Sequence, residues 1–182
     1  MSEESVDLGF AEPCGDSWKL LSHFFPSKLG GPPAWLNLSQ LPGYEDLKCS
    51  NCSRTCKFLL QLYSPDSNDS DGDGEEIEDE AFHRTLFLFV CAEEGCNKRS
   101  FKCYRSQLPR LNEFYSSEPP NEEEFDETGQ FPQATDFSSL CQVCHCSASK
   151  TCSKCKAARY CSKEHQLLHW RNGHRVNCSK EG

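Results

Sequence analysis

The sequence has no long apolar run and no excess of positive charge. A membrane-spanning helix needs about 20 predominantly apolar residues in a row, whereas the longest clear run, residues 86–91, has the length of one strand. The first eight residues hold Glu3, Glu4 and Asp7 but no base, which argues against a secretory signal peptide. The chain has 28 acidic and 19 basic residues, a formal net charge of -9. We therefore expect neither a membrane span nor a protein that coats nucleic acid, which needs a basic surface.

Cysteine, in contrast, is abundant, with 14 among 182 residues. Without a secretory signal, these thiols are expected in a reducing compartment, where they bind metal rather than form disulfides. A core of modest size helped by structural zinc is the expectation for such a chain. The spacing of the cysteines and histidines therefore carries most of the information in the sequence.

The charges are unevenly distributed along the chain. Residues 66–80 hold nine acids and no base, and residues 118–127 hold six acids around two prolines. The first stretch predicts a disordered acidic loop at 65–80, and the second an acidic, linker-like segment at 118–130. Residues 141–178 have seven bases and one acid, a formal +6, which leaves -15 for the rest of the chain. This break in composition predicts a module boundary near residue 138.

Eight potential zinc ligands follow that boundary, in four pairs. Two Cys-x2-Cys pairs come first, and one Cys-x3-His and one His-x3-Cys pair follow. Zinc takes four ligands tetrahedrally, so eight ligands make two closed sites. The x3 pairs fall one helical turn apart, and Ser162 is suited to cap a helix at 163–172 that ends at Gly173. The eight ligands are Cys141, Cys144, Cys152, Cys155, Cys161, His165, His174 and Cys178.

The string YCSKEHQLLHWRNGH, with the two upstream Cys-x2-Cys pairs and the closing His-x3-Cys, resembles a MYND-type zinc finger over residues 141–178. The resemblance implies that the pairs interleave. It assigns one zinc to Cys141, Cys144, Cys161 and His165, and the other to Cys152, Cys155, His174 and Cys178. The family usually has cysteine where His165 stands, but imidazole is a competent zinc ligand, so this site is expected to survive with one thiolate fewer.

Three other residues of this region compete for a ligand role. Cys146 lies too close to Cys144 to join the same knuckle easily, so we interpret it as structural or free. His145 is expected to be solvated. His169 stands four residues after His165 on the same helix face, and His165 is preferred because its spacing matches the family.

A second metal signal lies upstream. Cys49-x2-Cys52 precedes an apolar run at 57–63, and another run at 85–90 is followed at once by Cys91-x4-Cys96. Both runs are bounded by turn formers, which predicts strands. Paired as an antiparallel hairpin, they place the two cysteine pairs at one shared zinc, as in a zinc ribbon. Residues 101–105 would add a third strand.

Two features of the N-terminal part have competing interpretations, namely the remaining cysteines and the turn at residues 28–36. Cys56 and Cys103 compete for the third zinc, and Cys103 in mid-strand fits a buried, unliganded thiol better. Residues 28–36 predict a rigid turn that enters a short strand, with Trp35 in the core. This turn is not a phosphate-binding loop, because it lacks the Gly-Lys-Ser/Thr ending.

Five segments stand in a recognisable order: VDLGF at 6–10, FPSKLGGPPAWL at 25–36, CSNC at 49–52, AFHRTLFLFVC at 81–91 and FKCYRSQLPRLNEFY at 101–115. Together they resemble the N-terminal portion of the programmed cell death protein 2 family, with the finger in the expected place. Members usually continue into a further C-terminal domain. The chain is therefore expected to be an N-terminal fragment or an isoform without that domain, with short tails at 1–5 and 179–182.

The resemblance implies a dedicated chaperone or escort of a basic small-subunit ribosomal protein, which supports ribosome biogenesis in cytoplasm and nucleus. The alternative is a transcriptional adaptor whose finger docks proline-containing peptides or touches DNA. Nucleic acid is otherwise not expected as a partner, given the acidic chain, and no membrane contact is expected.

The sequence also argues against an enzyme. Catalytic zinc keeps an open position, whereas every site predicted here is closed by four protein ligands, and the His-x-Glu of zinc deaminases is absent. We therefore expect a protein-binding zinc protein with a mainly β fold and small α content. A zinc-ribbon-like β domain would occupy 6–138, and a MYND-type double-zinc module 139–178.

Overall fold

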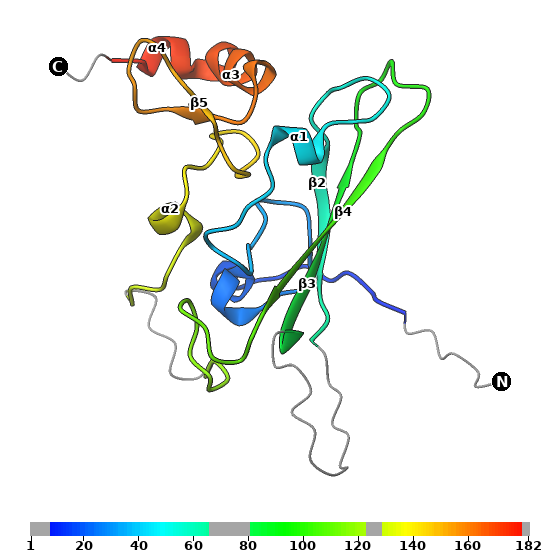
Figure 1. Ribbon diagram of the computed structural model, residues 1–182, viewed down its shortest axis with the longest axis vertical. Helices are drawn as coiled ribbons and strands as arrows, with labels where there is room; N and C mark the ends of the chain where they lie inside the picture. The colour runs from blue at the N-terminus through cyan, green and yellow to red at the C-terminus, as the bar shows by residue number, and fades with distance from the viewer. Residues whose placement is uncertain (1–7, 66–80, 123–128, 180–182) are drawn as a thin grey trace.

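The computed structural model describes residues 8–65, 81–122 and 129–179 of the chain. They form a four-stranded antiparallel sheet and a smaller cysteine-rich unit that contains a two-stranded sheet and the longest helix (Figure 1). The predicted mainly β fold with small α content is confirmed. The predicted tail at 1–5 and acidic stretch at 66–80 lie outside the described residues, as do 123–128 and 180–182. Among the described residues, none of the helices is long and apolar enough to cross a bilayer.

The larger sheet has the order β1-β2-β3-β4. Its strands are β1 (Lys28–Leu29), β2 (Lys57–Tyr63), β3 (His83–Val90) and β4 (Phe101–Leu108). Strand β2 has the predicted bounds, whereas β3 begins two residues earlier and β4 ends three residues later than predicted. Every second residue of β3 is buried. The sheet therefore has an inner face toward the core and an outer face.

The loop between β1 and β2 covers the inner face. Trp35 is 2% exposed, and its ring centroid lies 4.7 Å from that of Phe87 on β3. The predicted strand after the glycine pair is wrong: β1 precedes Gly30 and Gly31, which adopt left-handed φ values of 69° and 68°. Beyond them the backbone forms a hydrogen bond with a side chain and not with a neighbouring strand. The Ala34 N–H donates to the amide oxygen of Gln61.

Short helices complete the N-terminal part. The 3-10 helices η1 (Ser17–Leu20) and η2 (Ser22–Phe24) precede β1, α1 (Tyr44–Leu47) precedes the first cysteine pair, and α2 (Ala134–Phe137) leads to the finger. An aspartate fixes the start of both α1 and α2. Asp46 accepts from the Gly43 N–H and Asp136 from the Gln133 N–H, both at 2.8 Å.

The finger consists of β5 (Lys150–Thr151), β6 (Arg159–Tyr160), α3 (Lys163–His169), η4 (Trp170–His174) and α4 (Arg175–Asn177). The Ser162 side chain accepts a hydrogen bond from the His165 N–H at 3.2 Å, so the predicted cap is present. The helical turns break at Gly173, whose φ is 124°. A residue with a Cβ rarely adopts this φ, which explains why glycine stands there.

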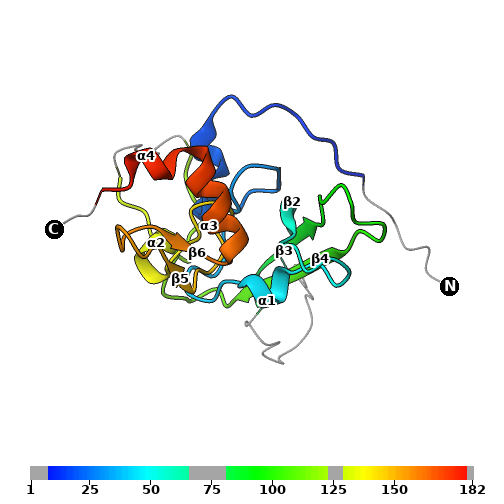
Figure 2. The same cartoon turned by 90° about the horizontal axis from the view of Figure 1, so that it is seen from above.

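The finger packs directly on the N-terminal part. The Trp35 indole N–H donates to the His145 carbonyl at 2.8 Å, and the Ser147 N–H donates to the Pro42 carbonyl at 3.0 Å. Cys146, inside the first finger knuckle, belongs to the same buried cluster as Trp35. In both views the finger and α2 lie on one side of the sheet (Figures 1 and 2).

Candidate metal centres

Three groups of four side chains gather potential zinc ligands among the described residues, with all ligand atoms of a group within 4.8 Å of one another. A tetrahedral zinc with bonds of about 2.3 Å holds two sulfurs about 3.8 Å apart, whereas a disulfide requires about 2.05 Å. Facing sulfurs in these groups lie 3.6–3.8 Å apart, which fits zinc. The groups are Cys49, Cys52, Cys91 and Cys96; Cys141, Cys144, Cys161 and His165; and Cys152, Cys155, His174 and Cys178.

The N-terminal group is built by two turns at the same end of the sheet. Cys49 and Cys52 lie on a turn closed by a 2.9 Å hydrogen bond from the Ser53 N–H to the Cys49 carbonyl. Cys91 directly follows β3, and Cys96 lies on the loop that enters β4. Because β2 and β3 are antiparallel, the start of β2 lies beside the end of β3. This pairing brings cysteines about 40 residues apart to one site, with Cys49 facing Cys96 at 3.8 Å.

Two polar side chains outside the ligand set contact these sulfurs. The Ser100 hydroxyl lies 3.2 Å from the Cys49 sulfur, and the Asn51 side-chain amide donates to the Cys96 sulfur at 3.2 Å. Ser100, with the backbone N–H of Cys52, lowers the pKa of Cys49 to about 5. Four thiolates give the site an excess of negative charge even with zinc bound, and such donors stabilise it. The cysteine spacing alone gave no signal for either residue.

Replacing Ser100 with alanine is expected to weaken zinc binding at this site by about tenfold, because partners of metal ligands contribute 10–100-fold to affinity. Ser50→Ala is the matched control, since the Ser50 hydroxyl accepts from Lys102 and not from a sulfur. Competition with a coloured chelator measures the release of each zinc. Equal competition curves for Ser100→Ala and Ser50→Ala would show that the Ser100 contact makes no contribution to zinc affinity.

The first finger group is built by a knuckle and the start of α3. The Cys144 and Cys161 sulfurs lie 3.6 Å apart. His165 is buried on the first turn of α3, with Nδ1 3.2 Å from the Cys161 sulfur and 3.5 Å from the Cys141 sulfur. Hydrogen bonds from Cys144 and Cys161 hold the pKa of Cys141 well below its ordinary range, which favours a thiolate. The imidazole thus stands where a fourth ligand is needed.

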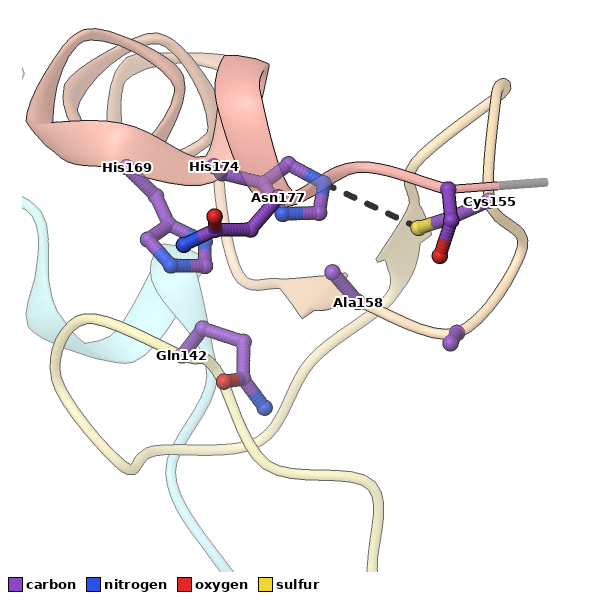
Figure 3. Close-up of a pocket in the computed structure, with 8 residues that line it drawn as sticks. Gln142, Cys155, Ala158, His169, His174 and Asn177 are labelled. Atoms are coloured by element: carbon purple, nitrogen blue, oxygen red, sulfur yellow. Dashed lines mark hydrogen bonds between the residues drawn. The ribbon is translucent and has the colours of Figure 1, made fainter. Parts of the chain in front are cut away.

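The second finger group joins the other knuckle to the last helical turns. His174 Nε2 lies 3.4 Å from the Cys152 sulfur. It also lies 3.7 Å from the Cys155 sulfur, toward which the imidazole points (Figure 3). Cys178, just after α4, has its sulfur 3.8 Å from that of Cys152. The backbone N–H of Cys155 lowers the pKa of Cys152 to about 6, against the opposing effect of burial. These thiolate-favouring contacts suit a divalent metal.

The residues that competed for these sites are placed outside the ligand groups. His169 Nδ1 lies 2.9 Å from the Tyr160 hydroxyl, and its ring stacks on His174 with centroids 4.8 Å apart. Cys146 is buried and His145 is exposed. His169 therefore supports the neighbouring ligand His174 and is not itself a member of a group.

Of the two cysteines that competed for the N-terminal site, Cys56 is buried and Cys103 is exposed. Neither belongs to a ligand group. The expectation of a buried Cys103 is wrong, because its strand position places it on the outer face of the sheet, opposite Leu88.

Each of the three groups offers four protein ligand atoms, the number that a closed tetrahedral zinc site requires. Such closed sites hold structural zinc, which stabilises folded loops that have little apolar surface of their own. Each group connects segments that are distant in sequence. These residues would therefore use bound zinc to hold the knuckles and strand ends in place. The shape of the surrounding surfaces depends on that fixation.

Two family models match the chain. The model for the programmed cell death protein 2, N-terminal domain, matches residues 5–122, and the MYND finger model matches residues 141–178. Programmed cell death protein 2 of Mus musculus is 49% identical over 176 residues, which is 96% of this chain and 48% of the mouse protein. The Rattus norvegicus protein is 48% identical over 177 residues, covering 97% and 48%.

A third relative matches over a much shorter stretch. Ubiquitin carboxyl-terminal hydrolase 16 of Arabidopsis thaliana is 55% identical over 38 residues, which is 21% of this chain and 4% of that protein. No solved structure matches at a significant level. The chain spans about half the length of the mouse and rat relatives.

Proposed function

The chain belongs to the programmed cell death protein 2 family, and from this premise we propose that it is a non-catalytic escort of a basic small-subunit ribosomal protein. Zinc holds its knuckles and sheet in shape, and the folded surface binds protein. The proposed setting is ribosome biogenesis in cytoplasm and nucleus. The three closed metal groups support a binding role, because each uses its ligands to hold structure.

The observation that carries this proposal is the charge distribution. Outside the finger the chain has a formal charge of -15, and the acids concentrate at 66–80 and 118–127. Ribosomal proteins are rich in lysine and arginine because they neutralise RNA phosphates, so a free one needs shielding before assembly. Acidic segments attract such a polypeptide over a distance and raise its association rate.

Replacing the nine acids of residues 66–80 with serine or glutamine tests the proposal. Binding to a purified small-subunit ribosomal protein is expected to weaken by about tenfold at low salt, with the difference vanishing as salt screens the charges. A variant with the order of residues 66–80 shuffled keeps the charge and is the matched control. Unchanged affinity and salt slope in the neutralised variant would exclude this segment from capture.

Exposed apolar side chains on the finger helices favour a second candidate, the transcriptional adaptor. Leu167 and Leu168 on α3 are 45% and 43% exposed, and Val176 on α4 is 81% exposed. Such exposed apolar side chains suit a proline-containing peptide. Leu167→Asp with Leu168→Asp should then abolish peptide binding and leave capture of the basic protein unchanged. A DNA contact through Lys150, Lys154 and Lys156 would instead show a steep salt slope on duplex DNA.

A further inference from the structure

The outer face of the four-stranded sheet carries many apolar side chains. The register places Leu60, Leu88 and Cys103 in one row across β2, β3 and β4, and the neighbouring row contains Leu62, Leu86 and Arg105. Leu62 and Phe101 are 49% and 64% exposed. We define the outer face by its apolar and thiol residues: Leu29, Leu60, Leu62, Leu86, Leu88, Val90, Phe101 and Cys103.

No described helix or strand packs over this face. The four strands contact one another, and the start of the β1–β2 connection, α2 and the finger lie on the opposite side of the sheet (Figure 1). The view from above shows the same arrangement (Figure 2). A sheet usually buries its apolar face against another layer, and a contiguous exposed apolar patch marks an interaction site.

The N-terminal segment is a second apolar feature on the same side. Residues 8–12 extend past the sheet to the side opposite the finger, as both views show (Figures 1 and 2). Leu8 and Phe10 are 77% and 85% exposed. The family model begins at residue 5, so this segment belongs to the family domain. One partner on that side could cover both the segment and the outer face.

The charge of the sheet indicates which partner fits. Strands β2, β3 and β4 contain Lys57, Arg84, Lys102 and Arg105 and no acid, although the whole chain is acidic. Lys57, Arg84 and Arg105 share the register of the outer face. These bases repel a basic polypeptide and favour a partner whose apolar surface is accompanied by carboxylates. The outer face is therefore unsuited to the basic client of the proposed function.

We infer that the outer face, together with Leu8 and Phe10, docks a polypeptide of the kind that forms the remaining half of the longer family members. The mouse and rat relatives align with nearly all of this chain yet are about twice as long. This chain, which corresponds to the shared half, leaves an apolar sheet face open, and the other half would supply a layer to cover it. This inference does not rest on the ribosomal client.

Cys103 reports on the coverage of the outer face, because it is an exposed thiol in the middle row. Two polypeptides are compared: this chain alone, and this chain followed by the part of the mouse relative outside the shared stretch. Alkylation by a maleimide is followed by peptide mass spectrometry, with the exposed Cys14 as internal reference. Cys103 should react about tenfold more slowly in the longer polypeptide, because only transient opening would expose it.

Leu62→Asp with Phe101→Asp in the longer polypeptide should restore rapid alkylation of Cys103. Both side chains are exposed in this chain, so the substitutions leave its own core intact. Leu111→Asp is the matched control, because Leu111 is 76% exposed and lies outside the sheet. Protection that persists in the double variant, or equal reactivity in the two polypeptides, would overturn the inference.

Two outcomes with this chain alone would also overturn it. Protection of Cys103 that grows with protein concentration would make a second copy the occupant. Protection that is independent of concentration and lost in Leu8→Ser with Phe10→Ser would make the chain's own N-terminal segment the occupant. The natural mouse relative provides a test without fusion: after cleavage between its halves, the two pieces should co-elute in gel filtration, and their separation would overturn the inference.

Discussion

Cys144→Ala is expected to unfold far more of the protein than Cys155→Ala, although each removes the second cysteine of a finger knuckle. Both side chains are half-buried ligands of a closed group. Loss of either should release one zinc, and loss of structural zinc is loss of folding free energy. The difference lies in what each knuckle contacts beyond its own metal.

The knuckle of Cys144 is part of the N-terminal core. Cys146 is 1% exposed within that core, and the intervening His145 carbonyl accepts from the Trp35 indole. Tyr44 packs from α1 onto the finger cluster. Cys155, in contrast, packs within the finger cluster only. Unfolding of the first knuckle therefore leaves the Trp35 N–H without its acceptor, whereas unfolding of the second leaves the sheet and its loop intact.

Zinc content and urea unfolding measure the difference. The unchanged protein should hold three zinc ions, one for each ligand group. Cys155→Ala should hold two and keep the unfolding midpoint of the N-terminal part. Cys144→Ala should lower the stability of that part by about 3 kcal/mol, the scale of a broken buried network. Equal midpoints for the two variants would show that the finger folds independently of the sheet.

The parts of this structure that sequence predicts best are local. Strand β2 and the cap at Ser162 follow from apolar runs, turn formers and capping chemistry within a few residues. The ligand groups follow because Cys-x2-Cys spacing and antiparallel pairing leave few alternatives. The MYND resemblance supplied the interleaving of the finger ligands, which spacing alone left open.

The sequence could not predict which face of the sheet is covered, or the contacts that depend on this. Leu88 and Phe89 are neighbours of similar hydrophobicity, yet Phe89 is buried and Leu88 lies on the outer face. The burial of Cys103 was mispredicted for this reason. Contacts between Trp35 and the finger, and between Ser100 and Cys49, join residues tens of positions apart, and no periodicity encodes them.

Gln61→Leu is expected to destabilise the protein by about 3 kcal/mol, a large effect for one polar residue on a strand. Gln61 is 1% exposed on the inner face, beside Phe87. Its amide oxygen accepts from the Ala34 N–H at 2.9 Å, and its amide nitrogen donates to the carbonyls of Pro26 and Ala34 at 2.9 and 3.2 Å. Leucine fills similar space but leaves these backbone groups unpaired, and each buried orphan costs about 1–3 kcal/mol.

Gln107→Leu provides the matched control, because Gln107 is half-buried on β4 and pairs with Arg84 on the outer side of the sheet. Its substitution should change stability by less than about 0.5 kcal/mol, as is usual for surface positions. Urea unfolding monitored by far-UV circular dichroism compares the two variants. Equal midpoints would show that water replaces the Gln61 contacts at no cost.

Gln61→Leu should also weaken zinc retention in the finger group of Cys141, while the finger group of Cys152 should be unaffected. Gln61 holds the loop that carries Trp35, and Trp35 donates to the carbonyl of His145 in the first finger knuckle. Loosening this loop should speed the loss of zinc from the group of Cys141 to a chelator. The group of Cys152 has no contact with the loop among the hydrogen bonds of the described residues, so it should keep its zinc. Equal loss from both finger groups would mean that the variant unfolds the finger as a whole.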